Sequence, residues 1–481
     1  MKLIILGFTL TCSLFATVNI PDTNQNGCYN NYNIINCQYK NSNFYGQDGN
    51  FITNKPSYTN NNDGTITDNI TKLIWSKAVD DKKVSLEEAK TIAKDMTLAG
   101  YSNWRVPTIK EMYSLIDFNG YTGFVHGDRS MKNVPSNAIP YINTNYFDFK
   151  YGASDERYID AQWLTSTKYV STTMNNMETL FGVNFADGRI KGYGYKRKNS
   201  FFDKKKFYVR YVRGTTQYGK NDFVDNLDKT LTDKSTNLIW TKIDSKKAMN
   251  WEEALKYSKN LSTGGYNDWR LPNAKELQYI VDYKKSPDTS FGPAINDKFI
   301  LTAIKNEIGQ KDYGYYWTST THQDGAKQYS NAAYVSFGRA IGKMRGSVMD
   351  VHGAGAQRSD PKTGTKKFHG PQGDAVRSNN YVLCVRGGDI QENNQEEQSS
   401  AILNRINIKQ NMIQNQGKNN QDNRREKRPN FVKRLDTNGD NKVSKDEFDG
   451  PLRAFERFDK NQNGFLSEDE APKGPPKRGR F

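Results

Sequence analysis

Histidine, cysteine and long apolar runs are all scarce in this chain. Its 481 residues include only 4 His and 4 Cys, and 35 % of the residues are hydrophobic. No stretch reaches the roughly 18 consecutive apolar residues of a membrane-crossing helix, so the sequence predicts no transmembrane segment. Aromatic residues are plentiful at 12 % and spread along the chain, which excludes disorder throughout. We therefore expect two or three polar, loop-rich domains with aromatic cores.

The first residues have the pattern of a secretory signal peptide. Lys2 precedes an apolar run over residues 3–16, and the sequence turns polar at Asn19. This pattern predicts a signal peptide over residues 1–18, with a buried first helix as the alternative. Cys12 would leave with the signal peptide or serve as a lipoprotein acylation site.

The other three cysteines follow in the predicted mature chain. Cys28 and Cys37 lie nine residues apart in an Asn-rich segment over residues 19–60. An oxidising compartment favours a local disulfide between them. Cys384 is left over, and we expect it to be buried as a small hydrophobic residue.

A tandem repeat is the clearest signal in the chain. Residues 67–117 align without a gap to residues 232–282, with 20 identities in 51 positions. A repeat period this long predicts two whole domains and not a solenoid. We place repeat 1 at residues 61–215 and repeat 2 at residues 226–388.

Each repeat begins with a Leu-Ile-Trp strand that two helices follow. The first helix is expected to end just before Gly100, or Gly265 in repeat 2, because glycine suits a left-handed residue after a helix. The remaining half of each repeat is aromatic and turn-rich, which predicts short antiparallel strands and an α+β fold class. The recurring tryptophans are expected to anchor the core. Capping boxes predict all four helix starts: Ser85 with Glu88, Thr108 with Glu111, Asn250 with Glu253, and Asn273 with Glu276.

The net charge of +16 belongs mostly to the repeats. From Asp389 onward there are 18 basic and 16 acidic residues, so the excess lies before that residue. Residues 389–428 are rich in Gln, Asn and Glu and predict a linker, and residues 473–481 form a basic tail. An acidic partner is therefore expected at the repeats.

Two segments within residues 429–472 have the spacing of calcium-binding loops. Oxygen side chains stand at loop positions 1, 3, 5, 9 and 12, and position 7 supplies a backbone carbonyl. Hard oxygen ligands without His or Cys argue against zinc. The second loop has two acidic ligands against three in the first, so we expect it to bind more weakly. The predicted Ca²⁺ ligands are Asp436, Asn438, Asp440, Lys442, Ser444 and Glu447 in loop 1, and Asp459, Asn461, Asn463, Phe465, Ser467 and Glu470 in loop 2.

Two further features accompany these loops. Position 6 of loop 1 is Asn441 where glycine is usual, but asparagine tolerates the left-handed conformation. Val443 and Leu466 at position 8 are expected to pair in a short two-stranded sheet. The loop pair resembles the bacterial EF-hand proteins, which implies a small all-α EF-hand domain.

The motifs that recur in both repeats resemble the Lcl C-terminal domain family of bacterial surface proteins. The resemblance rests on Leu73-Ile74-Trp75, on the run from Gly100 to Pro107, on Trp163 to Thr167, on Tyr208 to Gly214, and on their counterparts in repeat 2. It implies two C-type-lectin-like domains in tandem and an association with adhesion and with sulfated or acidic glycans. The Arg-x-Pro-Thr step is also similar to formylglycine-generating enzymes, but those need a cysteine pair that neither repeat has.

Repeat 2 contains a Gly-rich stretch over residues 350–374 that repeat 1 lacks. It holds His352 and His369 together with Arg358 and Lys362. Backbone N–H groups and cations in such a loop can hold sulfate or phosphate. A metal or acid–base site at His352, His369 and Asp350, or a merely solvated loop, are the alternatives.

The corresponding region of repeat 1 is shorter and basic. Lys196 and Arg197 stand next to Tyr195, and further lysines follow at 204–206. Aromatic faces stack on sugar rings while cations pair with acidic groups, so these residues are candidate ligand contacts. A solvated charge run is the alternative.

Together these features predict a calcium-binding bacterial protein that is secreted, periplasmic or on the cell surface. We expect it to adhere to or recognise acidic or sulfated polysaccharide, with no nucleic acid as a physiological partner and with no enzymatic activity. An oligomer is possible. The alternatives are an enzyme that acts on a sulfated or phosphorylated polymer through the His352–His369 stretch, and a structural envelope protein without a ligand.

Overall fold

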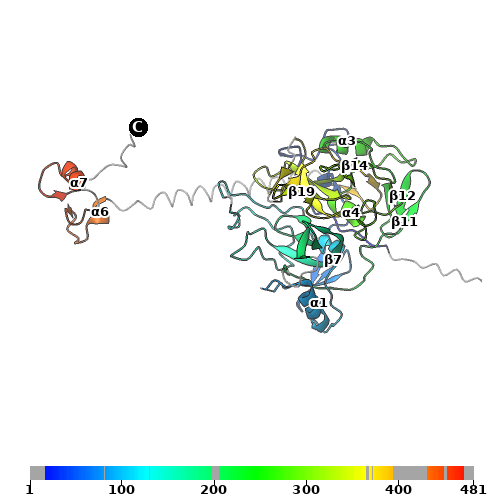
Figure 1. The fold of residues 1–481 in the computed structure, drawn as a ribbon, viewed down its shortest axis with the longest axis horizontal. Helices are drawn as coiled ribbons and strands as arrows, with labels where there is room; N and C mark the ends of the chain where they lie inside the picture. Colours follow the sequence, from blue (N-terminus) through cyan, green and yellow to red (C-terminus); the bar gives the residue numbers. More distant parts are fainter. Residues whose placement is uncertain are drawn as a thin grey trace, which may run out of the picture. The chain divides into compact units, whose positions relative to one another are not determined.

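The computed structural model describes most of the chain and divides it into two compact units. These units are Met1–Leu403 and Asn404–Phe481, and each is described by itself (Figure 1). The predicted signal peptide lies almost wholly outside the described residues. The described residues are 17–80, 82–128, 130–197, 205–364, 368–370, 372–393, 431–448 and 452–470.

Each repeat opens with a small antiparallel sheet that a strand from its own end completes. In repeat 1 the strand order is β10-β6-β5-β4, and in repeat 2 the equivalent order is β23-β13-β12-β11. The predicted Leu-Ile-Trp strands are present as β6 and β13. The strands are β4 (Tyr58–Asn60), β5 (Thr65–Asp68), β6 (Ile74–Ser76), β10 (Val212–Arg213), β11 (Phe223–Asp225), β12 (Thr230–Asp233), β13 (Leu238–Thr241) and β23 (Val385–Arg386).

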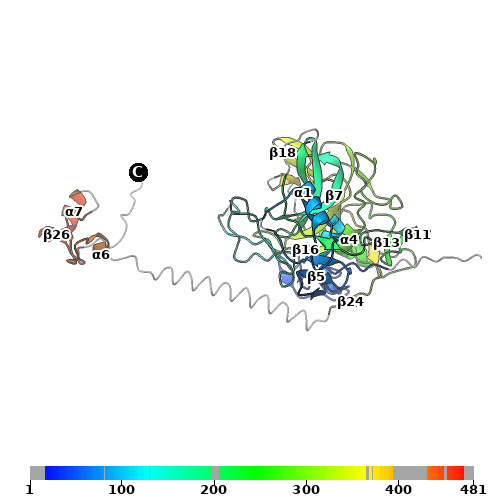
Figure 2. The same cartoon turned by 90° about the horizontal axis from the view of Figure 1, so that it is seen from below.

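Two short helices follow in each repeat, and all four predicted capping boxes are confirmed. In each box the cap side chain accepts the backbone N–H of the glutamate three residues on, and that glutamate reaches back to the cap backbone. The second helix of each repeat packs on the long strands of its own repeat. Figure 2 shows this for α4 (Ala274–Tyr279) beside β16 (Tyr315–His322). The helices are α1 (Leu86–Asp95), α2 (Ile109–Ser114), α3 (Trp251–Asn260) and α4 (Ala274–Tyr279).

The predicted role of Gly100 and Gly265 as helix ends is wrong. Helices α1 and α3 end five residues earlier, at Asp95 and Asn260. Both glycines are left-handed, with φ of +76° and +78°, but they close a tight turn further on. In repeat 1 this turn is fixed by mutual backbone hydrogen bonds between Leu98 and Tyr101.

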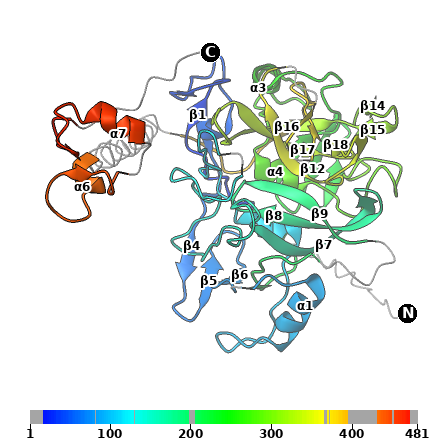
Figure 3. The same cartoon turned by 60° about the vertical axis from the view of Figure 1, so that its left-hand side comes forward.

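The second halves of both repeats form one six-stranded antiparallel sheet. Its order is β16-β17-β20-β9-β8-β7, so three strands come from each repeat (Figure 3). The repeats meet where Gln357 of β20 pairs with Ile190 of β9. The strands are β7 (Gln162–Thr173), β8 (Met177–Asn184), β9 (Arg189–Arg197), β16 (Tyr315–His322), β17 (Asn331–Ser336) and β20 (Gln357–Pro361).

Repeat 2 carries additional strands outside this sheet. Hairpin β18–β19 lies between β17 and β20 in the chain, whereas in repeat 1 β8 leads directly into β9. A second sheet therefore has the order β19-β18-β22-β21, and a separate hairpin pairs β14 with β15. These strands are β14 (Ala303–Lys305), β15 (Lys311–Tyr313), β18 (Ile341–Met344), β19 (Ser347–Asp350), β21 (Phe368–His369) and β22 (Asp374–Ala375).

The Asn-rich segment before repeat 1 packs as a set of short elements. Strand β1 pairs with β2, and β3 pairs with β24, a strand within the first residues of the predicted linker. The segment thus joins both ends of the tandem unit. The elements are β1 (Cys28–Tyr29), β2 (Ile34–Ile35), a 3-10 turn η1 (Asp48–Asn50), β3 (Phe51–Ile52) and β24 (Gln391–Glu392).

The largest core cluster is continuous across both repeats. It includes Met112 and Trp163 of repeat 1 together with Leu277 and Val335 of repeat 2. The prediction that the recurring tryptophans anchor the core is confirmed, because each is at most 4 % exposed: Trp75, Trp104, Trp163, Trp240, Trp269 and Trp317.

The described part of the second unit combines two short helices with a two-stranded sheet. Its helices are α6 (Phe431–Leu435) and α7 (Leu452–Phe458), and its strands are β25 (Val443–Ser444) and β26 (Phe465–Leu466).

The predicted fold class, α+β with two C-type-lectin-like domains in tandem and a small all-α EF-hand domain, is therefore wrong. The structure is mostly β, with 31 % strand and 11 % helix. The turn-rich halves of the repeats form long strands, of 12 residues in β7, while the repeat helices span only six to ten residues. In the described C-terminal residues, the ends of both loops pair as a sheet. No helix among the described residues is long and apolar enough to cross a membrane.

Candidate functional sites

Both C-terminal loops are folded around the carboxylate at their first position. In loop 1, Asp436 Oδ1 accepts the N–H of Gly439 at 2.7 Å and Oδ2 accepts the N–H of Asn441 at 2.8 Å. In loop 2, Asp459 Oδ2 accepts the N–H of Gly464 at 2.9 Å. Asn441 has a φ of +60°, so asparagine takes the left-handed position that glycine takes in loop 2.

The carboxylate at position 12 closes each loop. Glu447 Oε1 accepts the N–H of Thr437 at 3.0 Å, and Oε2 accepts the N–H of Ser444 at 2.9 Å. Glu470 makes the same two contacts with Lys460 at 3.0 Å and Ser467 at 3.2 Å. One side chain therefore ties the beginning of each loop to its end.

These hydrogen bonds keep both glutamates ionised. The backbone N–H of Ser444 is the main cause that lowers the pKa of Glu447 to about 2. The backbone N–H of Ser467 likewise lowers the pKa of Glu470. Both side chains are consequently negative at neutral pH, as a ligand for a hard cation must be.

The two loops are joined through their eighth positions. Val443 pairs with Leu466 in the β25–β26 sheet, which confirms the predicted cross-loop pairing. Both side chains are fully buried against Val432, Leu435 and Phe455. The two loops therefore share one apolar core.

The donor set of the loops fits Ca²⁺. Each loop offers carboxylate, amide and hydroxyl oxygens at five of the six predicted positions and a backbone carbonyl at the sixth, with no nitrogen or sulfur ligand among them. Within the described residues, no group of three or more His, Cys, Asp or Glu side chains gathers as a metal-binding set. A cation in these loops would therefore also need the Asn, Ser and backbone oxygens.

Three of the predicted ligand-binding residues in repeat 2 are internal. His352 is 1 % exposed, and its Nε2 lies 3.0 Å from Asp374 Oδ1. Arg358 also pairs with Asp374, and burial lowers the pKa of His352 well below its usual value. Lys362 is fully buried and donates to the carbonyl of Asn30 at 2.9 Å. All three side chains thus have protein partners, and their contact with a ligand stays a prediction.

His369 is linked to the buried His352 through Asp374, which both residues contact. It belongs to β21, where its backbone pairs with Asp374. Strand β20, which carries Arg358, takes the place beside β17 that β9 takes beside β8 in repeat 1. Arg358 is therefore part of the shared sheet and not of an added loop.

In repeat 1 the predicted aromatic contact is also internal. Tyr195 is 2 % exposed and donates its hydroxyl hydrogen to Glu178 at 2.9 Å. Tyr195 belongs to a buried core cluster together with Tyr193, whereas Lys196 is half-buried and Arg197, the last residue of β9, is exposed. Tyr195 is thus corrected to a core residue, and only its two basic neighbours reach the surface.

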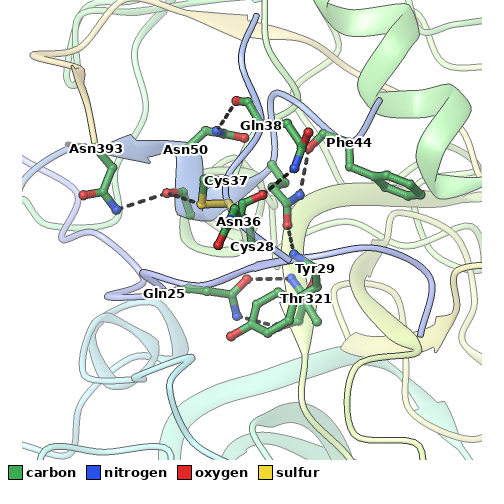
Figure 4. Close-up of a disulfide and its surroundings, with 12 residues drawn as sticks. Gln25, Cys28, Tyr29, Asn36, Cys37, Gln38, Phe44, Asn50, Thr321 and Asn393 are labelled. Atoms are coloured by element: carbon green, nitrogen blue, oxygen red, sulfur yellow. Dashed lines mark hydrogen bonds between the residues drawn. A yellow bond between two sulfur atoms is a disulfide. The ribbon is translucent and has the colours of Figure 1, made fainter. Parts of the chain in front are cut away.

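Cys28 and Cys37 form a disulfide beside η1 (Figure 4). Around it, the amide group of Asn393 donates to the carbonyl of Gly49 at 3.1 Å. Gln25 exchanges two hydrogen bonds with the backbone of Thr321 in β16, at 2.7 and 2.9 Å. The disulfide therefore lies where the N-terminal segment meets repeat 2. Cys384 is a buried free thiol, as predicted.

Sequence reasoning missed two lysines that lie at equivalent positions in the repeats. Lys110 of α2 lies 5.1 Å from the ring centroid of Tyr279 in α4 and donates to the carbonyl of Gly219 at 2.9 Å. Lys275 of α4 donates to the carbonyl of Ser114 in α2 at 2.8 Å. Burial lowers their pKa values to about 7 and about 8. Their shared position in the repeat was visible in the sequence, but their reciprocal contact was not.

A duplicated unit whose halves complete one sheet defines a tandem-repeat protein. The profile of the Lcl C-terminal domain matches residues 64–213 and 229–352, which is more than half of the chain. The chain therefore belongs to the Lcl C-terminal domain family, whose domain is of the bacterial surface type. No curated protein and no solved structure matches the chain.

Proposed function

We propose that this protein is a calcium-binding protein of the bacterial surface, with one Ca²⁺ in each C-terminal loop. The observation that carries the proposal is the shared hydrogen-bond pattern of the two loops. In both, the first carboxylate gathers N–H groups of the turn and the last carboxylate closes the loop. Two EF-hand-type loops with the same internal geometry, paired through β25 and β26, form the arrangement in which such loops bind calcium.

The ligands would be the oxygens at the predicted positions of each loop. Glu447 and Glu470 would supply the twelfth position, and Lys442 and Phe465 would supply backbone carbonyls. When bound, Ca²⁺ would neutralise the carboxylates that now accept backbone N–H bonds. Since loop 2 has two acidic ligands against three in loop 1, its affinity should be lower.

Isothermal titration calorimetry with the full chain tests this proposal. We expect two calcium ions per chain, with Glu447→Gln removing the tighter site and Glu470→Gln the weaker one. Asp446→Asn and Asp469→Asn are matched controls, because each removes an acid one position before the ligand. No calcium uptake by the wild type, or uptake unchanged in the Glu447→Gln/Glu470→Gln double variant, contradicts the proposal.

We further propose that the repeats recognise acidic or sulfated polysaccharide. The support is the excess of basic charge before Asp389, since the tail is nearly neutral. Within the described residues around β9, Arg197, Lys205 and Lys206 are exposed. These side chains replace the buried Tyr195, His352, Arg358 and Lys362 as candidate contacts. Secretion through the predicted signal peptide would bring them to such polymers.

Elution from a heparin column under a salt gradient tests the polysaccharide partner. We expect the triple variant Arg197→Gln/Lys205→Gln/Lys206→Gln to elute at lower salt than the wild type. The control Lys234→Gln/Lys284→Gln/Lys298→Gln removes the same charge from repeat 2. If both variants elute at the same lower salt concentration, the attraction to heparin is unspecific. If the wild type is not retained on the column and self-associates, the result favours a structural envelope protein.

A further inference from the structure

The β4–β5 turn of repeat 1 and the β11–β12 turn of repeat 2 have the same backbone geometry. Asn61 donates to Thr65 and Thr67, and Asn226 donates to Thr230 and Thr232, all at 2.8–3.0 Å. The next residue donates its N–H to the side chain two positions earlier, at 3.0 Å in both turns. The two turns can therefore be compared position by position.

The residues at the tips of these turns differ in kind. Repeat 1 has Asn62 and Gly64, with φ of +59° and +86°, which are the residue types that favour this conformation. Repeat 2 has Leu227 and Lys229 at φ of +64° and +74°. Leu227 is also 91 % exposed, so no contact in the fold offsets the cost of this backbone conformation. A strained, exposed leucine at this position is explained by neither stability nor solubility.

A second apolar replacement stands beside the turn. Ile300 donates its N–H to the carbonyl of Lys242, and Lys242 donates its own N–H to Lys229. The same two bonds in repeat 1 link Asp148 to Lys77 and Lys77 to Gly64. Asp148 is exposed in repeat 1, while Ile300 is 52 % exposed in repeat 2. Repeat 2 thus has two exposed aliphatic side chains where repeat 1 has polar ones.

Lysines surround this pair of aliphatic side chains. Lys229 and Lys298 are exposed, and Lys242 forms an ion pair with Asp225 at 2.5 Å. Hydrogen bonds from Lys242 and from the backbone N–H of Leu227 lower the pKa of Asp225, and the charge of Lys298 acts in the same direction. Asp228, the other acid of the turn, accepts the N–H of Thr230. Three lysines, Lys229, Lys242 and Lys298, therefore outnumber the two acids around the exposed apolar side chains. Strands β11 and β12 lie at the edge of the tandem unit (Figure 1).

We propose that the β11–β12 turn is a contact site for an anionic lipid surface, with Leu227 and Ile300 entering the apolar layer. A projecting aliphatic tip with lysines at its base matches acyl chains below negatively charged headgroups. The site lies in repeat 2 and does not depend on the calcium loops.

Sedimentation with vesicles tests the lipid contact. The full chain is mixed at low salt, in the presence of EDTA, with vesicles of phosphatidylglycerol and phosphatidylcholine or of phosphatidylcholine alone. We expect binding to the anionic vesicles that weakens with salt. Leu227→Asn should weaken it about ten-fold or more, the effect of losing one buried leucine. Because asparagine accepts the left-handed conformation, this variant should melt no lower than the wild type.

Two control variants show whether binding depends on this turn. Val134→Asn removes a 45 % exposed apolar residue from repeat 1 and should leave vesicle binding unchanged. Ile300→Asp, which restores the residue type of repeat 1, should weaken binding as Leu227→Asn does. Wild-type binding that does not require anionic lipid, or Leu227→Asn binding within about two-fold of the wild type, overturns the proposal. EDTA keeps calcium out, so the result is independent of the calcium loops.

Discussion

Asp48 in η1 is a buried carboxyl group at the meeting point of the N-terminal segment and repeat 2. It is 3 % exposed, and its Oδ2 accepts hydrogen bonds from Thr23 at 2.7 Å and Thr320 at 2.5 Å. Burial, followed by the charge of Asp22, raises its pKa to about 8. In the unfolded chain the group would titrate near its ordinary value of 3.8.

This shift predicts a pH-dependent loss of stability. Asp48 holds its proton more tightly in the folded protein than in the unfolded chain. Its contribution to the free energy of unfolding is therefore complete below the unfolded pKa of 3.8 and is lost as the pH rises through about 8. Asp48→Asn keeps an acceptor for both threonines but cannot ionise. We expect the free energy of unfolding of the variant, relative to that of the wild type, to increase between pH 4 and pH 8 by up to about 1.4 kcal/mol per pH unit.

Urea unfolding at several pH values measures this difference. Comparing the two proteins at each pH cancels the contribution of titrating groups that do not interact with Asp48. Asp155→Asn, at an exposed position, serves as the control. A constant free-energy difference between wild type and Asp48→Asn across this range would show that Asp48 does not titrate there.

At the scale of elements, the first residues of the helices could be predicted from the sequence because they depend on local hydrogen bonds. Ser85 accepts the N–H of Glu88 at 3.3 Å, and Glu88 Oε2 accepts the N–H of Ser85 at 2.7 Å. Asn250 and Glu253 repeat this box at the start of α3. The last residues of α1 and α3 could not be predicted in this way, because Gly100 and Gly265 belong to a turn that follows each helix. A glycine signals a positive φ but does not say which element it ends.

Removing a cap should therefore destabilise its own helix. Ser85→Ala and Asn250→Ala are each expected to cost about 1 kcal/mol in the free energy of unfolding. Denaturant titration followed by circular dichroism measures the loss. Ser102→Ala, at an exposed position in the turn after α1, should change little. An equal loss in that control would mean that the capping bonds contribute nothing specific.

At the scale of the whole molecule, the two repeats form one folding unit. Their sheets join at Ile190 and Gln357, and Arg189 of β9 forms an ion pair with Asp324 of repeat 2 at 2.5 Å. Lys275 of repeat 2 donates to the carbonyl of Ser114 in repeat 1, and Lys110 of repeat 1 lies over the ring of Tyr279 in repeat 2. The shared core also includes Ile20 of the N-terminal segment.

Separating the repeats should therefore abolish folding. A fragment of residues 226–393 exposes the edge of β20 and part of the common core, so we expect it to aggregate. Residues 17–393 keep both repeats and the N-terminal segment and should remain monomeric or form a defined oligomer. Size-exclusion chromatography and thermal melting compare the two. Cooperative unfolding of a soluble 226–393 fragment would contradict this prediction.

Much of the local structure followed from the residues alone. Short-range patterns in the sequence predicted several features that the structure confirms. These are the repeat, the Leu-Ile-Trp strands, the four capping boxes, the buried tryptophans and the pairing of Val443 with Leu466. The fold class did not follow, because hydrophobic periodicity could not show that the turn-rich halves extend into long strands. The burial of several candidate ligand residues did not follow for a related reason. Tyr195 and His352 have chemistry that suits binding, but only the fold decides whether such a side chain faces solvent or core.

The sequence by itself determined that this protein is a duplicated chain with two oxygen-rich loops at its end and its positive charge in the repeats. Only the tertiary structure decided that the repeats share a sheet, that Lys362 and Arg358 are enclosed by partners, and that Leu227 is left exposed on a strained turn. The physical reason is that burial and strand pairing arise between residues far apart in the chain, whereas caps, turns and loop ligands arise between near neighbours.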